Sequence, residues 1–148
     1  SKLNSDGVEI IPQTMPPFPW HFGGQRFHNL FVDPEGIMDY CQKTKMRVCL
    51  DVSHSKLACN YLKISFSKFL TDILPFTAHL HLADASGLDG EGLQIKSGEI
   101  DWENFLMLYS KICPKATFIP EIWQGHKNGG EGAWIALERL EKIFEHNK

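Results

Sequence analysis

Four polar side chains that could bind a metal ion each stand at the end of an apolar run of the sequence. They are Gln13, Asp51, His81 and Glu121. Carboxylate and amide oxygens together with an imidazole nitrogen suit Mn²⁺, Co²⁺, Mg²⁺ or Zn²⁺. Further groups of the same kind stand close by, namely His54, His79 and Asp84. A carboxylate and an imidazole at one strand end can also bind a polar substrate.

Asp51 also has a purely structural interpretation. Asp is a common N-cap residue because its carboxylate accepts hydrogen bonds from the first free N–H groups of a helix. A helical pattern begins near Ser55, shortly after Asp51. Capping and ligand binding therefore both remain open for this residue. The argument for a shared site is that four successive apolar runs, rather than one, end in such a side chain.

The apolar runs are rich in β-branched residues, which predicts strands at 8–13, 47–52, 78–84 and 117–122. Their nearly continuous apolarity is typical of strands that are covered on both faces. Helical patterns alternate with them, at 33–45, 55–74, 101–113 and 133–146. This alternation predicts an α/β fold of parallel β/α units in one domain spanning residues 1–148.

The links that follow the predicted strands are long, at 14–32, 85–100 and 123–132. In parallel sheets, functional residues gather on the loops outside the carboxyl ends of the strands. Trp20 and Arg26 lie in the first loop, where they could cover a sugar and bind an anion. Ordinary loop packing explains both equally well. In the second loop, Asp89 and Glu91 are interpreted as turn formers.

Composition excludes several classes of function. The net charge is −3 and no Lys/Arg run is long, which argues against a nucleic-acid partner. No apolar stretch approaches the roughly 20 residues of a membrane span, so no membrane partner is expected. The four cysteines form no CxxC pair, and we expect free thiols and a cytoplasmic location.

Several segments together resemble the C-terminal half of sugar-phosphate isomerases and epimerases of the xylose isomerase-like TIM-barrel superfamily. The matching segments are "LDVSH" (50–54), "HLHLADA" (79–85), "DGEGLQI" with "GEIDW" (89–102), "PEIWQGH" (120–126) and "MPPFPWHFGGQRFHNLF" (15–31). The resemblance implies the second half of a (β/α)8 barrel, strands five to eight. Such a barrel usually has about 250 residues, and this chain has 148.

The resemblance implies an isomerase or epimerase of carbohydrate metabolism that acts on a sugar or sugar phosphate. One divalent ion (Mn, Co, Mg or Zn) would polarise a carbonyl while a carboxylate transfers a proton. The implied metal ligands are Gln13, Asp51, His81 and Glu121. Glu121 would also be the base, with His54 holding a substrate oxygen. The candidate substrate-binding residues are Trp20, Arg26, His79 and His126.

Gln13 departs from the family pattern, which has a glutamate at this position. An amide cannot act as a base, so one-base isomerisation, dehydration or a binding-only role are alternatives to two-base epimerisation. An apurinic-site endonuclease-like phosphodiesterase is disfavoured, because the loop after 78–84 has no histidine and no basic DNA-binding surface is present. A further alternative is a degenerate barrel module that assembles with a synthase.

Half a barrel leaves two sheet edges without partners. We therefore expect a homodimer, or a complex with an N-terminal half-barrel, because closed symmetric dimers are the commonest way to pair such edges.

Overall fold

The computed structural model describes residues 7–18 and 29–146 of the chain. Its helices are α1 (Pro34–Thr44), α2 (Val52–Leu62), α3 (Phe66–Ile73), the 3₁₀ turn η1 (Leu74–Phe76), α4 (Trp102–Ile112) and α5 (Lys127–His146). Its strands are β1 (Val48–Asp51), β2 (Thr77–Leu82), β3 (Asp84–Ser86), β4 (Gly90–Leu93) and β5 (Thr117–Pro120). The predicted alternation of parallel strands and helices is confirmed.

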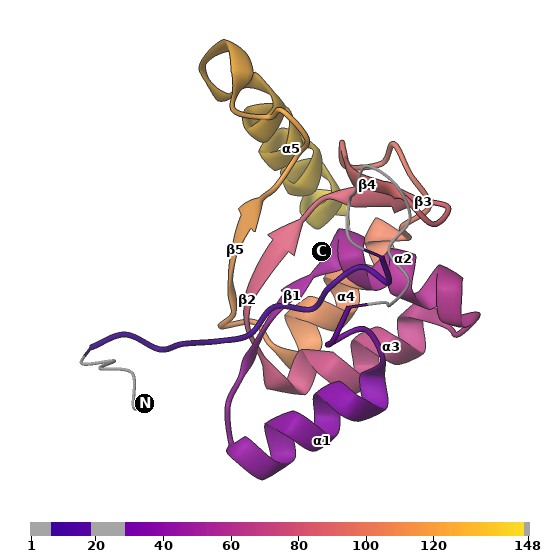
Figure 1. Cartoon of the computed structure of the whole chain (residues 1–148). Helices are drawn as coiled ribbons and strands as arrows, with labels where there is room; N and C mark the ends of the chain where they lie inside the picture. Colours follow the sequence, from indigo (N-terminus) through magenta and orange to yellow (C-terminus); the bar gives the residue numbers. More distant parts are fainter. Residues whose placement is uncertain (1–6, 19–28, 147–148) are drawn as a thin grey trace.

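The main sheet has the order β1-β2-β5, and all of its strands are parallel (Figure 1). Asp51 is paired with His81 across β1 and β2, and Leu82 is paired with Pro120 across β2 and β5. The order of these three strands across the sheet is the same as their order along the chain, with β3 and β4 inserted between β2 and β5. The carboxyl ends of these strands consequently lie at one rim, as the sequence predicts for a shared site.

The strand predicted at 8–13 is wrong for most of its length. In the structure only Gln13 forms a β-bridge, to Cys49, supported by a hydrogen bond from the Cys49 N–H to the Pro12 carbonyl. Pro12 has no N–H to donate to a ladder. Val8 and Ile10 are 66% and 46% exposed, and this segment runs away from the rest of the molecule (Figure 1).

The single helix predicted at 55–74 is two helices in the structure. Lys63 ends α2 in the left-handed conformation (φ 56°), and Ser65 caps α3 by accepting a hydrogen bond from the Lys68 N–H. Periodicity alone misses this break, because the apolar positions of both helices face the same core. α2 also begins earlier than predicted, directly after Asp51.

The loop predicted at 85–100 contains a small antiparallel hairpin, formed by β3 and β4. The helices predicted at 33–45 and 101–113 are present with their caps, and the one predicted at 133–146 lies within α5, where Asn128, Gly129 and Gly130 have positive φ angles. Asp33 caps α1 through the Gly36 N–H, and Asp101 caps α4 through the Asn104 N–H. In Figure 1 the hairpin follows β2 at the carboxyl end of the sheet.

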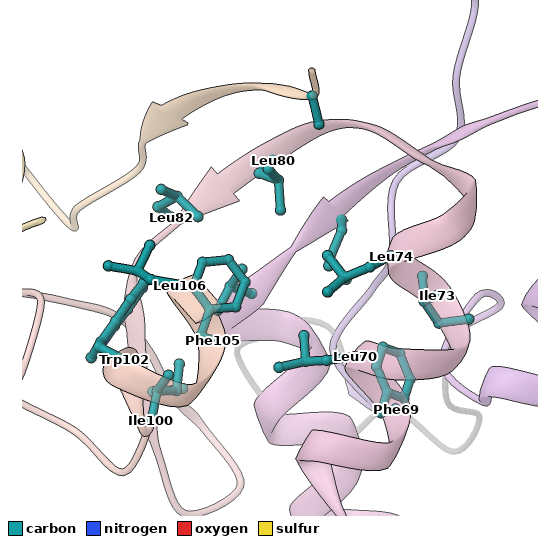
Figure 2. Packing of buried hydrophobic residues seen from close by; sticks show 14 of the residues in the cluster. Phe69, Leu70, Ile73, Leu74, Leu80, Leu82, Ile100, Trp102, Phe105 and Leu106 are labelled. Atoms are coloured by element: carbon teal, nitrogen blue, oxygen red, sulfur yellow. The ribbon is translucent and has the colours of Figure 1, made fainter. Parts of the chain in front are cut away.

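The core lies between the sheet and helices α1 to α4, and α5 adds Ala136, Leu140 and Ile143 to it. Leu80 and Leu82 of β2 point toward Phe105 and Trp102 of α4, and all four side chains are at most 2% exposed (Figure 2). Burial of one large apolar side chain stabilises a fold by about 1.5–3 kcal/mol. This packing holds β2 in place, and β2 is the strand that carries His81.

The edge of the sheet at β5 has no further strand among the described residues. Ile119, which is paired with His81, is 45% exposed. None of the helices in the described ranges is long and apolar enough to cross a membrane.

Candidate metal centre and active site

Three predicted metal ligands come together at the rim of the sheet. Asp51 ends β1, His81 lies opposite it on β2, and Glu121 follows β5 with its N–H bonded to the Leu82 carbonyl. One ligand atom from each of the three lies within 4.8 Å of the others. Three adjacent parallel strands thus bring together residues that are up to 70 positions apart in the sequence.

The two oxygens of Asp51 have different roles, so the capping and site interpretations are compatible. Oδ1 accepts a hydrogen bond from the His54 N–H at 2.9 Å, which caps α2. Oδ2 lies 3.7 Å from His81 Nδ1 and 3.2 Å from His54 Nδ1. The carboxylate is 3% exposed and is therefore held between the helix and the cluster.

His81 presents its Nδ1 to the two carboxylates. This atom lies 2.7 Å from Glu121 Oε2, yet it is buried and makes no well-oriented hydrogen bond within the described part of the chain. The contacts with Asp51 first, and also with Cys49 and Glu121, raise the pKa of His81 to about 12. A nitrogen flanked by two anionic oxygens can hold either a proton or a divalent cation.

The donor set therefore fits a divalent ion. One imidazole nitrogen and two carboxylate oxygens are a combination that Zn²⁺, Mn²⁺ and Co²⁺ accept. The contact with His81 lowers the pKa of Glu121, which keeps this carboxylate anionic at neutral pH. An ion bound here would replace the proton of His81 and neutralise part of the negative charge.

Gln13 lies beside the cluster, as predicted. Its Nε2 donates a hydrogen bond to Asp51 Oδ2 at 3.0 Å. In this arrangement Gln13 orients the carboxylate through its amide N–H. Its service as a metal ligand through the carbonyl oxygen remains a prediction.

His54 projects from the first turn of α2 toward the same rim. Its Nδ1 lies 3.1 Å from the Thr14 carbonyl and 3.2 Å from Asp51 Oδ2. Both neighbours are acceptors, so we assign the proton to Nδ1. Thr14 also accepts a hydrogen bond from the Asp51 N–H through its hydroxyl at 2.9 Å, which couples the two residues. Nε2 of His54 is left to face the cavity.

The turn role that the sequence predicts for Glu91 is wrong, whereas Asp89 lies in the turn between β3 and β4. Glu91 lies on β4, with Oε2 3.5 Å from His54 Nε2, and its side chain is 20% exposed. Burial raises the pKa of Glu91, His54 opposes this shift, and the negative charges of Asp51 and Glu121 add to it. The only signal in the sequence is a carboxylate between two glycines inside a long loop at the rim.

An open cavity of about 360 Å³ lies at this rim; Gln13 and His81 are not among its lining residues. Its lining includes three carboxylates and two imidazoles, those of Asp51, Glu91, Glu121, His54 and His126. His126 lines the same cavity as Glu121, and its role as a substrate-binding residue remains a prediction.

His79 lies two positions before His81 on β2, so both side chains are on the same face of the sheet, and their ring centroids are 5.4 Å apart. Its Nδ1 is 2.7 Å from Thr117 Oγ1, and the residue is not part of the cavity lining. Its role as a substrate-binding residue remains a prediction. Trp20 and Arg26, the other two candidates of this kind, lie outside the described residues.

Asp84 is buried below the site and is fully occupied by structural contacts. Its carboxylate accepts hydrogen bonds from the Ala85 and Ile100 N–H groups and from Trp102 Nε1, at 2.9, 3.1 and 2.9 Å. Asp84 thereby ties the start of the hairpin to the N-terminus of α4. It supports the loop above the site and is not a ligand.

The fold and the cluster define a half-barrel of parallel β/α units with a metal-type donor set at the carboxyl ends of its strands. The chain belongs to the xylose isomerase-like TIM-barrel family, whose family model matches residues 1–143. This confirms the resemblance seen in the sequence.

Solved structures with the same fold include one described as a crystal structure of a D-tagatose 3-epimerase-like protein. The TM-score is 0.72 at 19% identity, and the match covers 95% of this chain and 48% of that chain. This similarity supports the fold. The chain spans about half the length of that structure. No curated protein matches the chain.

Proposed function

We propose that this chain carries the site of a metal-dependent isomerase or epimerase that acts on a sugar or sugar phosphate. The observation that carries the proposal is the convergence of Asp51, His81 and Glu121, with a buried His81 nitrogen facing both carboxylates. Membership of the xylose isomerase-like family supports it. Asp51, His81 and Glu121 would hold one divalent ion, with Gln13 as a possible fourth ligand.

When bound, the ion supplies Lewis-acid polarisation of a carbonyl and its neighbouring hydroxyl. The chain's own residues move the proton. Glu121 is the proposed base, because its contact with His81 lowers its pKa and keeps it ionised, and because its side chain is 55% exposed and lines the cavity. His54 holds a substrate oxygen through Nε2, while its Nδ1 stays bound to the Thr14 carbonyl.

Gln13 makes the proposed proton transfer a one-base process. Its amide is held against Asp51 and cannot accept a proton from carbon. A single carboxylate can remove a proton at one carbon and return it at the next, while the proton of the neighbouring hydroxyl passes to the former carbonyl oxygen; together these transfers move the carbonyl by one carbon without a second base on the other face. Among the chemistries of this family, the site therefore favours isomerisation over epimerisation by two opposed glutamates.

Assembly completes the proposal. The edge of β5 has no further strand in the described ranges, and Ile119 next to His81 is exposed. The structural neighbour is about twice as long as this chain. We propose that a second copy, or a separate N-terminal half-barrel, covers this edge and closes the substrate site.

The test combines metal binding with proton exchange. Zn²⁺, Mn²⁺ and Co²⁺ are titrated into the purified chain, and a panel of ketoses is then incubated with it in D₂O. We expect stoichiometric metal binding and deuterium at a substrate carbon. Glu121→Gln should abolish the exchange, whereas Glu141→Gln on the exposed side of α5 should not. Metal binding without exchange on any sugar would instead support a binding-only module.

A further inference from the structure

Glu91 is a carboxylate without a hydrogen bond in the described part of the chain. Among the described residues, the ionisable group that it contacts is His54, whose Nε2 lies 3.5 Å from Oε2, longer than a normal hydrogen bond. The side chain is only 20% exposed and lines the cavity. An anionic oxygen in such a place lacks the donors that a partly buried carboxylate requires.

The backbone beside Glu91 is held from two directions, so its position is not that of a free loop. The Gly92 N–H donates to Ser53 Oγ at 3.0 Å, and the Gly92 carbonyl accepts from the Trp123 N–H at 2.7 Å. Gly92 has φ 69°, and a Cβ there would lie 3.3 Å from Trp123. β4 is thereby tied to both α2 and the segment after β5.

The charge of the cavity lining indicates what could satisfy Glu91. The lining contains three carboxylates and, among the described residues, no lysine or arginine. One divalent ion at the Asp51, His81 and Glu121 cluster would offset the charge of the two clustered carboxylates and leave Glu91, on β4, with His54 as its ionisable neighbour among the described residues. Hydroxyl groups can donate to a carboxylate, whereas a phosphate or carboxylate group placed there would be repelled.

We propose that Glu91 is a specificity-determining residue that accepts a hydrogen bond from a substrate hydroxyl. It selects the neutral, hydroxyl-bearing part of a sugar for this side of the cavity and excludes an anionic group from it. The inference rests on the proposed function, since it assumes a carbohydrate bound beside the metal cluster. The assignment of Glu91 narrows the proposed substrates to sugars whose end bound beside Glu91 carries no phosphate.

The experiment measures binding of two probes, D-fructose and D-fructose 6-phosphate, to the Zn²⁺-loaded chain by calorimetry or ligand-observed NMR. Three variants are compared with the parent chain. They are Glu91→Gln, Glu91→Asp and the control Asp89→Asn, which removes the same charge from an exposed position of the same hairpin.

We expect the parent chain to bind the neutral sugar more tightly than the phosphate. Glu91→Gln should weaken binding of the neutral sugar about tenfold or more, as is typical for loss of a hydrogen bond to a charged group. The same change should reduce the discrimination against the phosphate. Glu91→Asp should keep that discrimination, and Asp89→Asn should alter neither affinity more than about twofold.

Unchanged binding of the neutral sugar by Glu91→Gln would overturn this assignment, as would a parent chain that prefers the phosphate. If the parent binds Zn²⁺ and exchanges deuterium while Glu91→Gln binds sugar normally, only the role of Glu91 falls. If the parent neither binds a probe nor exchanges deuterium, the proposed function falls, and this assignment falls with it.

Discussion

Asp51 binds His54 twice, through a different oxygen each time. Oδ1 accepts the His54 backbone N–H at 2.9 Å, and Oδ2 lies 3.2 Å from the ring Nδ1. The first contact starts helix α2, and the second orients the imidazole at the candidate site. One carboxylate thus links the local structure of the helix to the chemistry of the rim, and the two roles can be separated by substitution.

Asp51→Asn and Asp51→Ala should differ in stability but not in metal binding. Asparagine is a good N-cap and alanine is not, so the alanine variant should be less stable by about 0.5–2 kcal/mol. Both variants lack the anionic oxygen and should lose Zn²⁺ affinity by at least tenfold. Urea unfolding and metal titration measure the two effects. Equal stability of the two variants would show that the cap contributes nothing.

Metal binding should become tighter as the pH rises through neutrality. The neighbours of His81, with Asp51 first, raise its pKa to about 12 in the metal-free chain, so the incoming ion must displace a proton. The expected increase is up to about tenfold in affinity per pH unit. Calorimetry in two buffers of different ionisation enthalpy would count the released protons. An affinity that does not change between pH 6 and 8 would contradict this view of His81.

The raised pKa of His81 also predicts how the stability of the metal-free chain changes with pH. A raised pKa means that protonated His81 is favoured in the folded chain. This contribution is fully present below the ordinary value of 6.5 and is lost as the pH rises toward the raised value. Unfolding measurements from pH 6 to 10 on the metal-free chain should therefore show a decline that His81→Gln reduces.

Asp84 should matter for stability and for the position of the hairpin. Asp84→Asn places an NH₂ group among three buried donors, which should cost about 1–3 kcal/mol. The change should also shift the environment of Trp102, which is readable by fluorescence. Asp89→Asn is the control and should lie within about 0.5 kcal/mol of the parent. A parent-like Asp84→Asn variant would mean that the buried carboxylate is dispensable.

Assembly through β5 can be tested by a charge at its exposed face. Ile119→Lys should leave the helix-side core intact, because this side chain is already 45% exposed. If copies pair through this edge, the substitution should shift a dimer toward monomer in analytical ultracentrifugation. A parent chain that is monomeric at micromolar concentration would contradict the homodimer.

The sequence predicted the rim of the site because strand ends are local features. Apolar, β-branched runs that stop at Asp51, His81 and Glu121 needed no long-range information to be recognised. Parallel β/α units then place all carboxyl ends at one edge, whatever the detailed packing. This regularity explains why the fold class and the clustering of Asp51, His81 and Glu121 were predictable.

Tertiary structure decided what depends on partners distant in the sequence. The segment at 8–13 is apolar enough for a strand, yet a strand also needs neighbours, and here only Gln13 has one. The local sequence around Glu91 indicates a turn. Its position at the cavity depends on the hydrogen bonds of Ser53 and Trp123 with the neighbouring Gly92. The dual role of Asp51 likewise depends on distant partners, because Gln13 and His81 lie beside Oδ2 while Oδ1 accepts the His54 N–H.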